Sequence, residues 1–195
     1  GLLYCRDFTE MNNEIRSFIE ITFPDEVIKE VARIQQFLLN RKFTGKLIEL
    51  GNLHLTLKFL GEISEEKVKE VKTKLKEVKF EKFEAKLEEI GTFNYRGIPR
   101  IVWIKIGGRG VFELQKLIDE KLKGLGFEPE GRFMSHLTIA RIKYVKDKNA
   151  FHDYVERLNI KPLRFIIEDF KLIKSDLGIS GPVYSVLKKF NSNSS

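Results

Sequence analysis

Apolar side chains in the first 80 residues recur with two different spacings. Residues 14–22 form a short run rich in β-branched side chains, which predicts a strand. After Pro24 the apolar positions return every three to four residues, and the acidic Asp25 and Glu26 suit the first turn of a helix. Ser64 is placed to cap a second helix. The predicted elements are strands at 14–22, 46–50 and 53–60 and helices at 24–39 and 65–78.

The second half of the chain repeats this alternation of strands and helices. Two extended stretches flank the Gly- and Pro-containing loop 94–99, which indicates an antiparallel pair. A helical stripe of apolar residues ends near Gly126. The predicted elements are strands at 83–93, 100–106, 132–143, 163–174 and 183–190 and helices at 110–125 and 147–158. The pattern predicts an α/β or α+β protein with two similar lobes.

The composition indicates a folded protein with a basic surface. Of the 195 residues 42% are apolar and 16 are Phe, which excludes a disordered chain. A net charge of +7 favours an anionic partner such as nucleic acid, although solvated lysines on helix faces would give the same sum. Abundant Lys and Glu with few Cys and Met favour a thermophilic source.

The remaining bulk features concern location and the chain ends. Cys5 is the single cysteine, so an intramolecular disulfide is excluded and a reducing compartment, the cytoplasm, is expected. No run approaches the ~18 apolar residues of a membrane span. The polar residues 191–195 offer nothing to pack, and we expect them to be disordered.

Two of the three histidines stand in the same short sequence word. His54 is followed by Leu and Thr56, and His136 is followed by Leu and Thr138, each within an apolar strand segment. With Thr at ~5% of residues, this coincidence has a chance of about one in 400. Strand alternation puts each His and its Thr on one face. If both strands face one cleft, two imidazoles and two hydroxyls converge there.

This pair of words suits acid–base chemistry on a phosphate. Imidazole can act as general base or general acid near neutral pH, and in-line attack of water on a phosphodiester needs both. The threonine hydroxyls can bond the non-bridging oxygens. One such word alone would more often be a buried core histidine, a preference that the repetition reverses. Metal binding is the other alternative, but neither word contains Asp, Glu or Cys. His152 is not followed by such a threonine and is expected at or near the surface.

Several other residues are candidates for contact with a nucleic acid. Lys58 and Arg132 share strand parity with the histidines, whereas Arg141 does so only if its strand bends; surface charge is the alternative for all three and the favoured one for Lys58. The loop residues Tyr95, Arg96 and Arg100 can stack a base and meet its backbone, or form an ordinary exposed hairpin. Trp103 is expected in the core.

Five segments carry a family resemblance over nearly the whole chain: RSFIEI, NLHLTLKFLGE, PRIVW, RFMSHLTIARI and GPVYSVLKKF. Together they resemble the two-histidine phosphoesterase superfamily, in particular its bacterial and archaeal RNA 2′,3′-cyclic phosphodiesterase (2′-5′ RNA ligase) branch. The resemblance implies an α+β fold of two pseudo-symmetric lobes, each an antiparallel sheet with helices on its outer face, around a central cleft. Residues 11–190 would form this single domain, after an N-terminal extension at 1–10.

The resemblance also implies a reaction and a role for each site residue. The enzyme would be a monomer that opens a 2′,3′-cyclic phosphate at an RNA end to a 2′-phosphate, without metal or cofactor. Transfer RNA halves are candidate substrates, and 2′-5′ ligation is a candidate side activity. Ser135 stands where many relatives have Pro, a change expected to affect the start of the strand more than the chemistry. The implied roles are His54 as proton donor, His136 as proton acceptor, and Thr56, Thr138 and Arg141 as phosphate-binding residues, with Arg132 as a further candidate.

Two other functional classes stay open at this point. One is an RNA-binding module that holds ends without turnover, and the other is a metal-dependent phosphohydrolase. The presence of both histidines with both threonines favours the enzyme over the binding module. Activity in the presence of a chelator would separate the metal-independent enzyme from the metal-dependent one.

Overall fold

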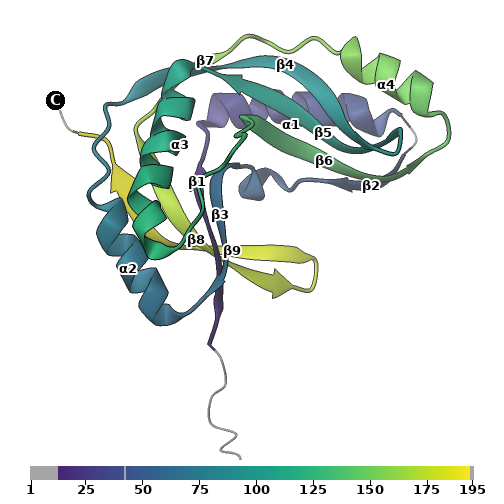
Figure 1. The fold of residues 1–195 in the computed structure, drawn as a ribbon. Helices are drawn as coiled ribbons and strands as arrows, with labels where there is room; N and C mark the ends of the chain where they lie inside the picture. Colours follow the sequence, from purple (N-terminus) through teal and green to yellow (C-terminus); the bar gives the residue numbers. More distant parts are fainter. Residues whose placement is uncertain (1–12, 42, 194–195) are drawn as a thin grey trace, which may run out of the picture.

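The computed structural model describes residues 13–41 and 43–193, so the expected extension at 1–10 lies outside the described residues (Figure 1). Strands and helices alternate in chain order, with two short 3-10 turns at 50–52 and 123–125. The elements are β1 (Ile15–Ile21), α1 (Asp25–Leu39), β2 (Phe43–Leu47), β3 (Leu55–Ile63), α2 (Glu65–Leu75), β4 (Phe83–Tyr95), β5 (Ile98–Gly107), α3 (Arg109–Leu122), β6 (His136–Val145), α4 (Lys148–Glu156), β7 (Arg164–Ile167), β8 (Asp169–Gly178) and β9 (Gly181–Asn191).

The strands form two antiparallel sheets. Sheet A has the order β3-β1-β8-β9, and sheet B has the order β2-β6-β5-β4-β7. Helices α2 and α3 contact each other on one side of the molecule, and α3 contacts both β3 and β4, whereas α1 and α4 contact strands of sheet B (Figure 1). This arrangement confirms the predicted α+β fold with two lobes.

Each sheet is covered by a helix that follows a strand of the other sheet. Helix α1 follows β1 of sheet A, yet its Gln35 amide donates hydrogen bonds to the carbonyls of Ile48 and Ile139 beside sheet B, at 2.9 and 3.0 Å. Helix α3 follows β5 of sheet B, and its Gln115 amide donates to the carbonyl of Leu57 in β3 at 3.4 Å. The two lobes are therefore interlocked through buried hydrogen bonds.

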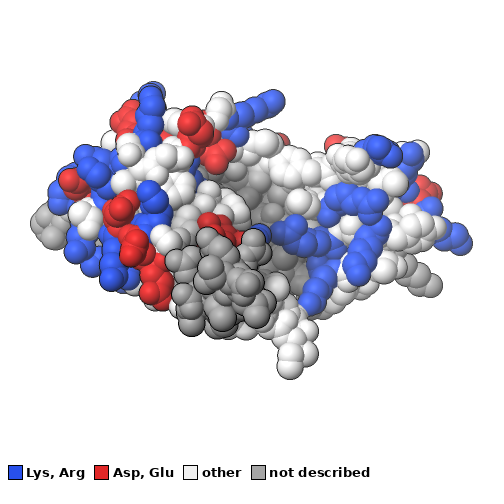
Figure 2. Space-filling model, turned by 60° about the horizontal axis from the view of Figure 1, so that its bottom comes forward, with Lys and Arg blue, Asp and Glu red and all other residues white. Residues whose placement is uncertain are grey.

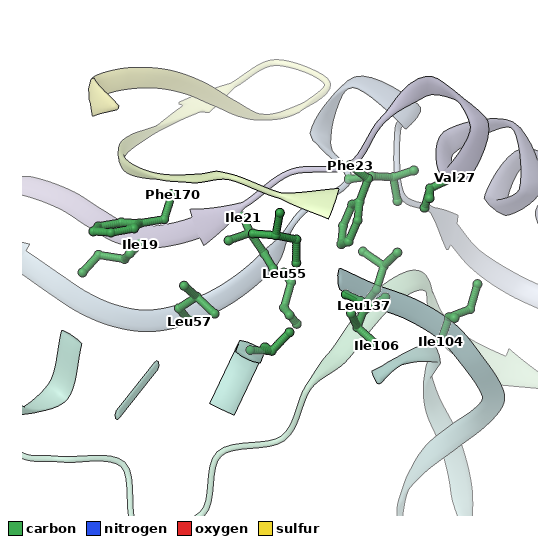
Figure 3. Close-up of a cluster of buried hydrophobic side chains, with 14 of the residues drawn as sticks. Ile19, Ile21, Phe23, Val27, Leu55, Leu57, Ile104, Ile106, Leu137 and Phe170 are labelled. Carbon is green, nitrogen blue, oxygen red and sulfur yellow. The ribbon is translucent and has the colours of Figure 1, made fainter. Parts of the chain in front are cut away.

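The buried apolar side chains form one cluster that runs through both lobes. Figure 3 shows Ile21 and Leu55 of sheet A together with Ile104 and Leu137 of sheet B, next to Phe23. Burial of each such side chain stabilises the fold by about 1.5–3 kcal/mol. Because the lobes share this core, the positions of the two sheets depend on each other.

The helix ends follow the expected capping rules. The Ser64 hydroxyl accepts a hydrogen bond from the backbone N–H of Lys67, as predicted, and Asp147 caps α4 through the N–H of Ala150. Gly126 takes a positive φ of 89° after the 3-10 turn that follows α3, a conformation that glycine adopts without strain. No helix in the described ranges is both long and apolar enough to cross a membrane.

Two strand predictions were wrong in extent. The stretch 163–174 is not one strand: it breaks at Glu168, so that β7 belongs to sheet B and β8 to sheet A. Only Glu168 separates the two strands, and the stretch contains neither Gly nor Pro, so the sequence carries no turn signal for the change of sheet. The strand predicted at 132–143 begins only at His136, which leaves Arg132 in the preceding loop.

Residues 191–193 of the polar tail are joined to the rest of the protein through the backbone. Asn191 ends β9, and the backbone N–H groups of Ser192 and Asn193 donate to the carbonyls of Glu168 and Phe80 at 2.7 and 2.8 Å. Backbone hydrogen bonds hold this segment, and they do not require apolar side chains. Residues 194 and 195 lie outside the described residues.

Lys58 is buried, with 3% of its surface exposed, which corrects the expectation of a surface charge. Its ammonium pairs with the Asp119 carboxylate of α3 and donates to the carbonyl of Glu128 at 2.8 Å. Asp119 also accepts a hydrogen bond from the N–H of Glu130 at 2.9 Å. A buried charge needs such a partner. The network joins β3 to the loop that leads to His136.

Candidate active site

The open faces of the two sheets line a cleft of about 380 Å³. Both His-x-Thr words and Arg141 line it, so the structure brings together the residues that the sequence singled out. Arg132 does not: it is exposed in the loop before β6 and is not among the lining residues, so strand parity cannot direct it to the cleft. Further lining residues are Lys46, Leu47, Ile48, Glu49, Asn52, Met134, Ser180, Gly181, Pro182 and Tyr184.

A β-bulge in β6 explains how Arg141 reaches the cleft. Thr138 pairs with Trp103 and Ala140 with Val102, so Ile139 is the extra residue of the strand. Ile139 and Ala140 are both fully buried, which shifts the alternation by one position. Arg141 therefore shares the open face with His136 and Thr138. Regular alternation along a straight strand would have turned Arg141 away from the histidines, as the sequence pattern predicted. The bulge removes this difficulty.

The first word carries the same irregularity at the equivalent position. In β3, Thr56 pairs with Glu20 and Lys58 with Ile19, which leaves Leu57 as the extra residue, three positions after His54. Each sheet thus has a bulge three residues beyond its catalytic candidate. The two words are alike in backbone geometry as well as in sequence.

His54 stands one residue before β3, with its ring between aromatic neighbours. Its Nδ1 donates a hydrogen bond to the carbonyl of Asn52 at 2.7 Å, since a carbonyl can only accept. Its Nε2 lies 3.0 Å from the Thr56 hydroxyl. The rings of Phe18 and Tyr184 lie 4.9 and 5.3 Å from it between centroids. Burial lowers the pKa of His54; the Asn52 carbonyl opposes this shift and the charge of Arg141 adds to it.

The cross-strand neighbour of Thr56 is a buried carboxylate that sequence reasoning missed. Glu20 is 6% exposed, and its Oε2 lies 3.9 Å from His54 Nδ1. Burial raises the pKa of Glu20 to about 7; the charge of Lys171 lowers it and that of Asp169 raises it. The available signal was an acidic residue placed between Ile19 and Ile21 in the predicted strand.

His136 begins β6 and lies flat on an indole ring. Its ring stacks on Trp103 with centroids 3.9 Å apart and planes 8° apart, and Phe93 lies 5.1 Å away. Trp103 is half-buried on the cleft side of sheet B, which corrects its expected place in the core. Burial lowers the pKa of His136, the charge of Lys105 lowers it further, and Glu89 raises it. Each histidine thus has a cation that lowers its pKa, Arg141 for His54 and Lys105 for His136, and a carboxylate as a second charged neighbour.

The third histidine lies apart from this cleft, as the sequence suggested. His152 is partly exposed in α4, where its Nε2 lies 3.2 Å from a Glu156 carboxylate oxygen. Among the residues that the structure describes, no three His, Cys, Asp or Glu side chains are grouped so as to share a metal ion.

The fold and this cleft define a phosphoesterase of the two-lobed class. The chain matches the family described as LigT-like phosphoesterase over residues 21–103 and 107–184, which together span both lobes. The chain belongs to this family, as the sequence motifs predicted.

Similar proteins support this membership over the full length. The RNA 2′,3′-cyclic phosphodiesterase of Methanocaldococcus jannaschii is 37% identical over 178 residues, which are 90% of this chain and 100% of that protein. The protein of the same name from Thermotoga maritima is 34% identical over 89% of this chain and 93% of its own length. A crystal structure of a Thermus thermophilus protein matches with a TM-score of 0.79, 28% identity and coverage of 91% and 97%. The crystal structure of Escherichia coli LigT complexed with 3′-AMP matches with a TM-score of 0.71 and 25% identity, over 93% of this chain and 99% of that one.

Substitution of Gly91 by Ala should detach Trp103 from His136. A Cβ at position 91 would lie 2.4 Å from the indole Cζ2 atom, so the ring must move. Trp103 is the only tryptophan, and protonated imidazole quenches indole fluorescence. We expect wild-type emission to titrate with a midpoint below 6.5, the ordinary pKa of histidine, because the pKa of His136 is lowered. Gly91→Ala should lose this titration.

Gly124→Ala is the matched control for this measurement, because an added Cβ there meets no atom within 4 Å. It should keep the wild-type emission and its pH dependence. An unchanged titration in Gly91→Ala would contradict the stacked arrangement.

Proposed function

We propose that the protein hydrolyses 2′,3′-cyclic phosphates at RNA ends to 2′-phosphates by metal-independent acid–base catalysis. The observation that carries the proposal is the placement of two identical words, on equivalent bulged strands, in one cleft. The names of the relatives supply the substrate class.

The reaction follows from the two imidazoles on the cleft face. His136 takes a proton from a water molecule as the water oxygen attacks phosphorus. The bond between phosphorus and the 3′ oxygen breaks, and His54 gives its Nε2 proton to that oxygen. The products are a 2′-phosphate and a 3′-hydroxyl, and the histidines have exchanged protonation states. Such acid–base assistance accelerates a reaction typically ~10²–10⁴-fold.

The charged neighbours support this assignment of roles. Glu20 becomes ionised as the pH rises through about 7, and its carboxylate then favours the protonated form of His54, 3.9 Å away. This carboxylate opposes the lowering of the His54 pKa by burial and by the charge of Arg141. Lys105 instead favours the neutral form of His136, which a general base requires. The two histidines therefore stand at equivalent positions of similar strands but have different charged neighbours.

The hydroxyls and the guanidinium supply the phosphate contacts. Thr56 lies within hydrogen-bond distance of His54 Nε2, where the transferred proton sits, so a phosphate oxygen bound there is adjacent to the acid. Arg141 extends from the bulged strand into the same cleft and offers a planar fork for two oxygens. These donors meet the negative charge that grows on the phosphate in the transition state.

The same site would also accept a 5′-hydroxyl in place of water. His136 would remove the proton of that hydroxyl, and attack on the cyclic phosphate would form a 2′-5′ linkage with release of the 3′ oxygen. Transfer RNA halves, which present both ends, are the substrates we propose for this side activity.

Hydrolysis of an oligonucleotide with a 2′,3′-cyclic phosphate should persist in EDTA and yield a 2′-phosphate. His54→Ala and His136→Ala should each lower kcat by ~10²–10⁴-fold, because each removes one proton transfer. Chromatographic product analysis separates 2′-phosphate, 3′-phosphate and joined products. His152→Ala is the control and should remain active.

Full activity in His136→Ala would exclude the mechanism. Activity lost in EDTA and restored by a divalent ion would instead identify a metal-dependent hydrolase, and binding without turnover would identify an RNA-end-binding module.

The pH dependence of kcat/KM should separate the two histidines. Lys105→Gln removes the charge that lowers the pKa of His136, so this pKa should rise. Because a general base must be neutral, the acid limb should move to higher pH while the alkaline limb stays in place. Lys86→Gln is the control, since Lys86 also lies near Glu88 yet is not a source of the His136 shift. Movement of the alkaline limb instead would reverse the two roles.

A further inference from the structure

Three neighbouring strands of sheet B carry positive charge without any acidic residue. β2, β6 and β5 are adjacent, and within their bounds neither Asp nor Glu occurs. In Figure 2 Lys and Arg side chains lie on both halves of the molecule; on the right-hand half, where Figure 1 draws β2 and the far ends of β5 and β6, few Asp or Glu lie beside them. The cations on these strands are Lys46, Arg100, Lys105, Arg141 and Lys143.

This charge begins inside the catalytic cleft. Lys46, Arg141, Ile101 and Phe93 are successive register partners on four neighbouring strands, so they form one row across sheet B. Lys46 and Arg141 of this row line the cleft. Outward from the row, the Arg100 guanidinium donates to the backbone carbonyl of Lys143, which fixes the two strands to each other. The positive surface is therefore continuous with the site of chemistry.

Two exposed tyrosines stand beyond this row. Tyr144 is 61% exposed and lies three residues beyond Arg141 in β6, a distance of ~10 Å along a strand. Tyr95 is also 61% exposed, two residues beyond Phe93, and the Arg96 guanidinium lies 5.3 Å from its ring centroid. Helices α1 and α4 pack on sheet B, so its other face is the open one.

From this arrangement we infer that the outer end of sheet B binds the RNA strand on the 5′ side of the cyclic phosphate. Cations that follow a backbone and aromatic rings that stack bases are the two components of single-strand recognition. The ~10 Å from Arg141 to Tyr144 corresponds to about three stacked nucleotides. The inference rests on the proposed function and makes the preferred substrate an oligonucleotide rather than a cyclic mononucleotide.

The other lobe does not offer an equivalent path. Strands of sheet A carry carboxylates among their cations, among them Glu62 in β3 and Asp176 in β8, whose carboxylate lies 3.8 Å from the Lys174 ammonium. The residue of β3 equivalent to Arg141, five positions after the histidine, is Phe59. Acidic groups repel phosphates, so the strand is directed across sheet B.

Two substrates test this inference: cytidine 2′,3′-cyclic monophosphate and a single-stranded RNA of eight nucleotides with a 2′,3′-cyclic phosphate. The wild-type kcat/KM should be at least tenfold higher for the octamer and should fall more steeply with salt. Two double variants remove parts of the surface: Arg96→Ser with Lys143→Ser, and Tyr95→Ser with Tyr144→Ser. Each should lose most of the preference for the octamer, while its kcat/KM for the mononucleotide should stay within about twofold of wild type.

Lys69→Ser with Lys79→Ser removes the same charge from exposed positions in α2 and in the segment that follows it, so it is the control and should behave as wild type. Circular dichroism and thermal unfolding of each variant establish that it is folded. Equal loss on both substrates, or an octamer advantage that survives in both variants, would overturn the inference.

Failure of the proposed function is recognised separately. If wild type hydrolyses neither substrate, the proposed reaction is wrong, and binding of the labelled octamer by anisotropy then tests the surface alone. Weaker binding by both variants but not by the control supports the RNA path, whereas equal binding by all proteins overturns it.

Discussion

The two His-x-Thr words are positioned by the burial of apolar side chains on the opposite face of the same strand. Leu55 and Leu57 in β3, and Leu137 and Ile139 in β6, are almost fully buried in the shared core. A slip of one residue would turn these side chains outward, so their burial fixes the register. The bulge three residues after each histidine then shifts the alternation once, which brings Arg141 to the open face.

Symmetry of the backbone does not extend to the neighbours of the two histidines. The partner of Thr56 across the sheet is Glu20, whereas the partner of Thr138 is Trp103. One imidazole therefore lies beside a carboxylate that ionises near neutral pH, and the other stacks on an indole near a lysine. An acid and a base need opposite protonation states at the start of one turnover. In the proposed mechanism, a duplicated scaffold with different neighbours would supply both roles without separate elements for each.

The sequence was sufficient to predict the words at 54–56 and 136–138, because repetition and strand alternation are local properties. It was not sufficient for Arg141, since a bulge follows from packing of the whole sheet and leaves no mark in the residue pattern. The burial of Lys58 depends on a carboxylate 61 residues away, and no local pattern records such a partner. The division of 163–174 between two sheets was missed for a similar reason: no Gly or Pro separates the two parts, and only the tertiary fold assigns them to different lobes.

The central claim is that both words bind one phosphate, and nuclear magnetic resonance of the three histidines tests it most directly. A nucleoside 2′-monophosphate would be titrated into the protein while the imidazole Cε1 proton resonances are followed. Because the chain has only three histidines, each signal can be assigned by substitution. The resonances of His54 and His136 should shift together with one Kd, and that of His152 should stay in place. A shift of only one cleft histidine, or two different Kd values, would contradict a shared phosphate site.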